Sequence, residues 1–128
     1  MSSDSRDPAP PLMTLMTGET PPLDLVTIRT TIRRALQERP FRPPAHEIAE
    51  LTRTLRAYLK AMLTEAQHRA DQLEPDTTAR DRWDALISHV LADLDFGAGT
   101  ERPVRCAAQA YLEILARDAR FLADCLDE

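Results

Sequence analysis

Glycine, cysteine and aromatic residues are scarce in this sequence. It holds 3 glycines and 2 cysteines, and aromatic residues make up 5% of its 128 residues. The β-branched and aromatic residues rarely alternate with polar ones, so the pattern expected of a β-strand is missing. Leucine, alanine, arginine and the acidic residues dominate instead, and most of these favour helices or helix ends. The composition therefore predicts an all-α protein.

Long hydrophobic runs and a basic leader are also missing. No stretch approaches the roughly 18 uncharged apolar residues of a membrane-spanning helix. The first residues do not combine a basic region with an apolar run, as a signal peptide does. With two cysteines and no export signal, we expect a cytoplasmic protein. Hydrophobic residues make up 43%, enough for one domain of this length to bury a core without disulfides or a metal.

Positive charge is in the minority, since the net charge is -5 and the pI is near 5.2. Nucleic-acid-binding proteins usually carry a basic field, so nucleic acid is a disfavoured partner. Arg29, Arg33 and Arg34 nevertheless gather in the first expected helix, whereas residues 93–128 are mainly acidic. One interpretation is an interaction surface for phosphate or an acidic partner. The other is attraction between the first and last helices of one bundle.

The chain divides into a tail and a helical domain. Residues 1–22 are rich in Ser, Asp, Thr and Pro and predict a flexible, disordered tail, followed by a bundle domain over 23–128. Apolar residues at spacings of three and four predict four helices. The first begins between 20 and 24, with two prolines in its first turn, and ends near 39. The others span about 44–73, 77–94 and 100–126.

Short, proline-rich or glycine-containing connections separate these helices. Asp76 or Thr77 is expected to cap the third helix and Thr100 the fourth, while Gly97 suits the end of the third. Short connections make successive helices antiparallel, so the sequence predicts an antiparallel four-helix bundle. The apolar positions expected inside include Leu91. Four more fall outside the first core stripe and indicate either a wide buried face or a dimer interface: Leu63, Leu112, Ile114 and Phe121.

No catalytic, cofactor or metal motif stands out. Glu65 and His68 have the spacing of one di-iron ligand pair, but no second pair accompanies them. His46 and Glu47 begin like a zinc-protease motif, but a glutamate stands where its second histidine belongs. His89 has no cysteine or histidine at ligand spacing and is expected near the surface. We therefore predict no catalytic residue, no cofactor and no metal ligand, and an enzymatic role is disfavoured.

The two cysteines, Cys106 and Cys125, both fall on the last expected helix. Nineteen residues of helix separate them by about 28 Å, which no disulfide spans. Cys125 is expected to be a small core residue. Cys106 is expected to be exposed near a helix N-terminus, where a thiol pKa is lowered, but no histidine stands close to it in the sequence. We interpret Cys106 as incidental.

Scattered residues over about 47–126 carry a resemblance to a known family: Glu50-Leu51-Thr52, Leu55-Arg56, Leu59, Glu65, Arg69-Ala70, Leu73, Leu115-Ala116-Arg117, Leu122 and Cys125. In these the chain resembles a family of small all-helical proteins from GC-rich filamentous bacteria, labelled natural-product biosynthesis proteins because of their gene neighbourhood. Thr64 stands where the family pattern has a proline. The resemblance implies a helical accessory protein without an assigned activity. A GC-rich genome also fits Lys60 being the only lysine.

Three functions follow as hypotheses. The first is a non-enzymatic protein-interaction module, an accessory or regulatory factor in specialised metabolism, with a protein partner or self-association. The second is a small-ligand-binding or catalytic bundle with a pocket near Tyr58, Trp83 and Tyr111. The third is a nucleic-acid-associated regulator that acts through the arginines of the first helix.

Overall fold

Four helices make up the fold in the computed structural model, which describes residues 23–98 and 105–128. They are α1 (Leu25–Leu36), α2 (Ala45–Asp71), α3 (Thr78–Ala98) and α4 (Arg105–Leu126). No strand occurs among these residues, so the predicted all-α, four-helix architecture is confirmed. The predicted tail, residues 1–22, lies outside the described residues, and so does Thr100 with its expected cap.

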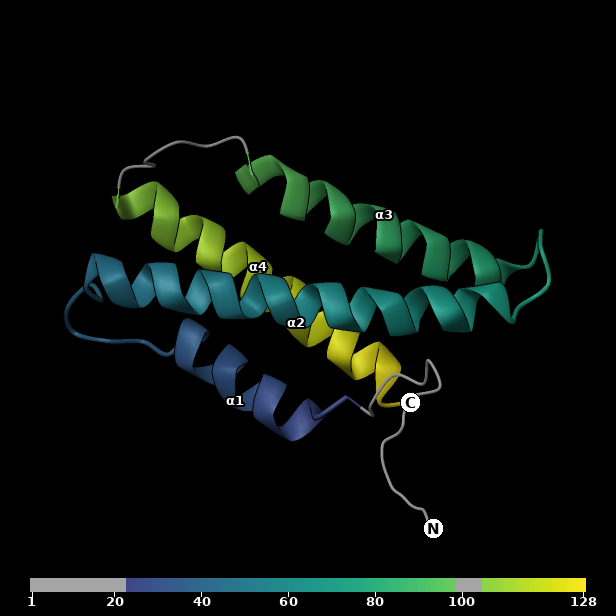
Figure 1. Cartoon of the computed structure of the whole chain (residues 1–128), viewed down its shortest axis with the longest axis horizontal. Coiled ribbons are helices and arrows are strands. Elements are labelled where there is room, and N and C mark those ends of the chain that lie inside the picture. Colours follow the sequence, from purple (N-terminus) through teal and green to yellow (C-terminus); the bar gives the residue numbers. More distant parts are fainter. Residues whose placement is uncertain (1–22, 99–104) are drawn as a thin grey trace, which may run out of the picture.

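Helices α2 and α4 form the centre of the bundle, and successive helices run antiparallel (Figure 1). α1 packs on one side of this pair and α3 on the other, so that α1 and α3 make no contact in the described part of the chain. Ala66 and Ala70 of α2 and Ala116 and Ala119 of α4 are fully buried. Small side chains at a contact let two helix axes approach closely.

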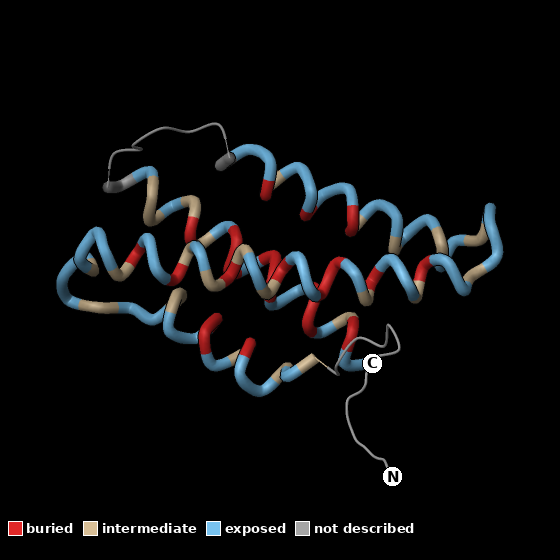
Figure 2. The backbone as a smooth tube through the Cα atoms, viewed as in Figure 1, coloured by how far each residue is buried: buried red, intermediate tan, exposed pale blue. Residues whose placement is uncertain are grey.

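The core is one continuous cluster to which all four helices contribute (Figure 2). Leu55, Leu59 and Met62 of α2 are completely shielded from water and lie at its middle. Leu63 and Leu112 are buried, so α2 and α4 each carry a wide apolar face. Ile114 is 39% exposed and Phe121 61%, which leaves apolar surface on α4 that no described helix covers.

Polar side chains fix where the first and third helices begin. The Asp24 carboxylate accepts hydrogen bonds from the Thr27 amide at 3.1 Å and from its hydroxyl at 2.6 Å, so α1 begins directly after Asp24. Accepting these bonds lowers the pKa of Asp24. Thr77 accepts from the amide of Arg80 at 3.2 Å and caps α3, as the sequence predicts. Asp76 just before it has a φ of 66°, in a region that short polar residues tolerate.

Four details of the sequence prediction are wrong. α1 begins at Leu25, after the cap Asp24, so its first turn does not contain the two expected prolines. α1 ends at Leu36 and not near 39: the backbone is already extended at Gln37, and Arg39, which precedes a proline, is disfavoured in the helical conformation. α3 continues to Ala98 instead of ending near 94, because one glycine in a last turn costs only about 1 kcal/mol. Leu91 is 51% exposed, because α3 buries only the narrow stripe that contains Ile87 and Val90.

Candidate functional site

A groove of about 850 Å³ lies between α3 and α4, and we call it the α3–α4 groove. Its apolar lining includes Trp83 and Leu86 from α3 and Phe121 from α4. His89 and Asp118 also line it, and they bring an imidazole and a carboxylate to a largely apolar surface. In this groove, apolar walls and ionisable groups therefore meet.

The groove exists because α3 does not close fully on α4. α3 packs more extensively on α2 than on α4, and it turns the small side chains of Ala79 and Ala85 towards the groove. Since the two helices are antiparallel, their lining residues follow each other in opposite order. His89 and Asp118 therefore lie at one end of the groove, and Ala79 and Glu128 lie towards the other.

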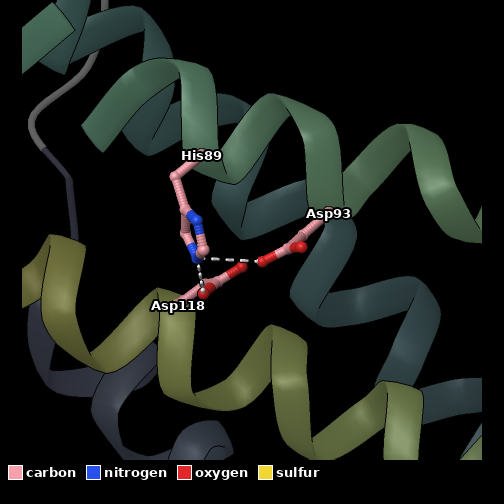
Figure 3. A group of neighbouring side chains, drawn as sticks. All are labelled: His89, Asp93 and Asp118. Carbon is pink, nitrogen blue, oxygen red and sulfur yellow. Dashed lines mark ion pairs between the residues drawn. The ribbon is translucent and has the colours of Figure 1, made fainter. Parts of the chain in front are cut away.

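Three side chains converge at that end, and we call them the acid–histidine cluster: His89, Asp93 and Asp118 (Figure 3). His89 and Asp93 are four residues apart on α3, which places them on one face of the helix. His89 Nε2 lies 3.2 Å from Asp93 Oδ2 and 3.4 Å from Asp118 Oδ1. The cluster thus joins α3 to α4 through one imidazole and two carboxyls.

Asp118 enters the cluster from the core side. It stands three residues after Leu115 and four before Leu122, both fully buried, so the helical repeat places it in the buried stripe of α4. Its side chain is 10% exposed, compared with 25% for Asp93 and 64% for His89. Its Oδ2 atom has no hydrogen-bond partner among the described residues. A buried carboxylate oxygen without a donor is costly, and it is common at functional sites.

Burial away from water raises the pKa of the Asp118 carboxyl from its ordinary value of 3.8 to about 7. A hydrogen bond with the carboxyl of Asp93, which requires a proton on one of the two groups, and the negative charge of Asp93 act in the same direction. His89 acts in the opposite direction. Strongly perturbed carboxyls in a groove are typical of binding and catalytic sites.

A hydrogen-bond network holds the segment of α3 that carries Asp93. The Tyr111 hydroxyl donates to the main-chain oxygen of Asp93 at 2.9 Å. The Arg56 guanidinium of α2 donates to the Leu94 oxygen and to the Tyr111 hydroxyl, both at 2.8 Å. This network ties α2, α3 and α4 together beside the cluster and limits how far Asp93 can move from Asp118.

A model of a family of unknown function, DUF6415, matches residues 26–128, which covers all of α2, α3 and α4 and nearly all of α1. The chain belongs to the DUF6415 family. No curated protein and no solved structure matches it. The family match starts about twenty residues before the resemblance noted from the sequence and includes the whole α3–α4 groove. Within the described helices, none has a stretch that is long and apolar enough to cross a bilayer.

The three aromatic residues predicted around a pocket lie in different surroundings in this DUF6415 fold. Trp83 lines the α3–α4 groove. Tyr111 packs against the core, and its hydroxyl donates to the main-chain oxygen of Asp93. Tyr58 packs against the core from α2 and does not line the groove. Trp83 thus forms part of the groove wall, and Tyr111 lies beside the acid–histidine cluster.

The arginines of α1 face the end of α4 and the solvent. Arg29 donates to Asp124 at 2.7 Å and to Asp127 at 3.4 Å, so the basic first helix and the acidic last helix do attract each other. The bond with Asp124 raises the pKa of Arg29. Arg33 donates to Thr30 at 3.3 Å, and Arg34 is exposed. Neither Arg33 nor Arg34 forms an ion pair with an acidic residue in the part of the chain that the structure describes, and both face solvent.

The other polar residues considered from the sequence as possible site residues lie on the surface or line the groove. Glu65 pairs with Arg69 at 3.2 Å and His68 is exposed, so the surface interpretation of that pair is confirmed. Glu47 pairs with Arg39, and this bond lowers the pKa of Glu47. Cys125 is not the core residue that the sequence predicts: it is half-buried and lines the groove, and burial raises the pKa of its thiol. The side chain of Cys106 lies outside the described part of the chain.

Sequence reasoning missed the acid–histidine cluster. His89 has no cysteine or histidine at ligand spacing, and on that ground it was predicted to be a residue near the surface. Two signals were present: a histidine and an aspartate four residues apart on one helix, and an aspartate at an apolar stripe position of another helix. Neither signal reveals that α3 and α4 meet at this level, because that depends on the packing of both helices on α2.

Proposed function

We propose that the protein binds a small organic molecule in the α3–α4 groove, with the apolar part of the molecule against Trp83, Leu86 and Phe121. A polar group of the same molecule would face the acid–histidine cluster. The observation that carries this proposal is the groove of about 850 Å³ with a buried, partnerless carboxylate oxygen at one end.

Size and lining support this proposal. Ligand sites usually enclose roughly 300–1,000 Å³ and combine apolar walls with a few convergent polar groups. The groove has both properties, and the raised pKa of Asp118 marks its polar end. A carboxyl kept at a core position without a full set of donors is what a protein retains for binding and not for stability.

The proposal extends to a role in specialised metabolism. The resemblance to proteins labelled by biosynthetic gene neighbourhood implies an accessory or regulatory role. A groove for a small organic molecule would suit such a protein, since accessory factors of a pathway can bind its intermediates or products. The cytoplasmic location expected from the sequence belongs to the same proposal.

The single tryptophan provides the test, because Trp83 lines the groove. N-phenyl-1-naphthylamine, a neutral apolar probe, is titrated in the presence of EDTA while Trp83 emission and probe emission are recorded. We expect saturable quenching of Trp83 with micromolar affinity. Ala85→Phe, which fills the groove, should weaken binding about tenfold, the cost of losing roughly 1.4 kcal/mol.

Ala61→Phe is the matched control, because Ala61 is exposed on α2 and does not line the groove. It should bind the probe as tightly as the wild type. If the two variants bind equally, or if Trp83 emission does not respond, the groove is not a ligand site.

A protein-interaction role is the second candidate, and the exposed apolar residues of α4 favour it. Phe121 is 61% exposed and Ile114 39%, two turns apart on one helix. A self-associating protein would bury both. Light scattering on a sizing column should then give a mass above 14.4 kDa that falls to this value in the variant with Ile114→Ser and Phe121→Ser. A monomeric wild type would contradict self-association through α4.

A further inference from the structure

The acid–histidine cluster has the donor geometry of a metal site. Its three residues each offer one ligand atom, a ring nitrogen or a carboxylate oxygen, and these atoms lie within 4.8 Å of one another. Ligands that bind Zn²⁺ at about 2.0–2.2 Å in tetrahedral arrangement lie about 3.3–3.6 Å apart. The two nitrogen–oxygen distances in the cluster, 3.2 and 3.4 Å, are close to that spacing.

A second observation is independent of this spacing. The Asp118 side chain is nine-tenths buried, and its Oδ2 has no hydrogen-bond partner among the described residues. In Figure 3 its carboxyl points to the space between α3 and α4 that also receives the Asp93 carboxyl and the His89 imidazole. With both carboxyls ionised, the cluster contains more acceptors and more negative charge than the single proton on His89 Nε2 can satisfy.

A protonated His89 would not remove this excess. Its Nε2 carries a single proton, and two carboxylates already lie at 3.2 and 3.4 Å from that atom. Oδ2 of an ionised Asp118 would still lack a donor. A dication placed among the three side chains, in contrast, bonds to one atom of each and neutralises both carboxylates.

We propose that His89, Asp93 and Asp118 bind a divalent transition-metal ion, with Zn²⁺ as the best match. The ion would lie at the end of the α3–α4 groove that His89 and Asp118 line. One imidazole and two carboxylates suit Zn²⁺, whereas Mg²⁺ and Ca²⁺ prefer oxygen ligands alone. Three protein ligands leave one position of a tetrahedral ion open, as in catalytic zinc sites.

The surroundings suit such an ion. His89 and Asp118 also line the groove, so the open position would be accessible from it. The hydrogen bonds from Tyr111 and Arg56 hold the segment of α3 that carries Asp93, which keeps the ligands in place before the ion binds. The metal site does not depend on the proposed organic ligand. If both exist, the ligand would carry a donor atom for the ion.

Metal binding is tested on the full chain after removal of metals with EDTA and dialysis. Isothermal titration with Zn²⁺ should give one site per chain with micromolar or tighter affinity. Co²⁺ should give the intense visible absorption of a low-symmetry, four-coordinate site. Loss of a group that merely supports a metal ligand already costs roughly 10- to 100-fold in affinity. Asp118→Asn and His89→Gln should therefore each weaken Zn²⁺ binding by about 100-fold or more.

The controls are an aspartate and a histidine outside the cluster. Asp95→Asn changes an exposed residue of α3 two positions from Asp93, and His68→Gln changes an exposed histidine of α2. Both should bind Zn²⁺ like the wild type, and circular dichroism should show all four variants folded. Absence of Zn²⁺ binding by the wild type, or equal affinity in Asp118→Asn, would overturn the metal site. Probe binding in EDTA, which tests the groove, would be unaffected by either outcome.

Discussion

Replacing Leu59 with alanine should lower the free energy of unfolding by about 2–5 kcal/mol. Leu59 lies on α2 at the middle of the core and is completely shielded from water. The substitution removes the transfer free energy of the lost carbon atoms. It also leaves a cavity that the surrounding helices cannot fill without moving apart. Urea unfolding followed by circular dichroism measures the effect, and a change of this size is a large part of the total stability of a small domain.

Leu91→Ala is the matched control, because Leu91 is a leucine in the middle of a helix that is 51% exposed. Alanine and leucine differ little in helix propensity, so this variant should stay within about 0.5 kcal/mol of the wild type. Equal losses in the two variants would contradict the packing described here, because they would mean that α3 buries Leu91 as deeply as α2 buries Leu59.

The contrast between Leu59 and Leu91 also shows what periodicity can predict. On α2 the apolar spacing identifies buried residues well, because the helix is central and has neighbours on several sides. On α3 the same reasoning placed Leu91 inside, although this helix packs along a narrow stripe. Periodicity gives the direction of an apolar face, but the width of the face that is covered depends on the neighbouring helices.

Helix ends are predictable where their cause lies close in the sequence and unpredictable where it depends on packing. The capping role of Thr77 was predictable because it depends on residues close in the sequence. The proline at 40 sets a local limit for α1, but the sequence does not show that the helix ends three residues before Arg39, at Leu36. The extension of α3 through Gly97 was not predictable from propensity, because a cost of about 1 kcal/mol is easily overridden by packing.

The candidate site was the least predictable part. The sequence shows His89 and Asp93 as a pair on one helix. Their partner, Asp118, follows Asp93 by 25 residues and lies on another helix. In the sequence, Asp118 stands out only as a charged residue within an apolar stripe. The sequence does not show which side of α4 is covered by α3. An aspartate at such a position conflicts with the local pattern, and conflicts of this kind concentrate at functional sites.

Stability should report the state of Asp118 as the pH changes. Its pKa is about 7 in the folded protein against an ordinary value of 3.8, so between these values the folded state holds the proton more tightly than the unfolded state. Stability contributed by the protonated group is fully present below about pH 4 and is lost as the pH rises towards 7. At roughly 1.4 kcal/mol per pKa unit, the loss is on the order of 2–4 kcal/mol.

Asp118→Asn isolates this effect, because asparagine has a similar shape and does not titrate. Asp24 and Glu47, whose pKa values are lowered, make the opposite contribution, but they do so equally in both proteins. We therefore expect the variant to gain about 2–4 kcal/mol on the wild type between pH 4.5 and pH 8, measured by urea unfolding in EDTA. Asp95→Asn, which changes an exposed aspartate, should show no such trend. Of the two groups that face Asp118 from α3, Asp93 favours the protonated carboxyl and His89 the ionised one. A pH-independent difference between Asp118→Asn and wild type would therefore mean that His89 keeps the carboxylate ionised throughout this range. Growth of the difference with pH would instead identify Asp118 as a group that destabilises the metal-free fold at neutral pH. Its place in the core would then be explained by what it binds.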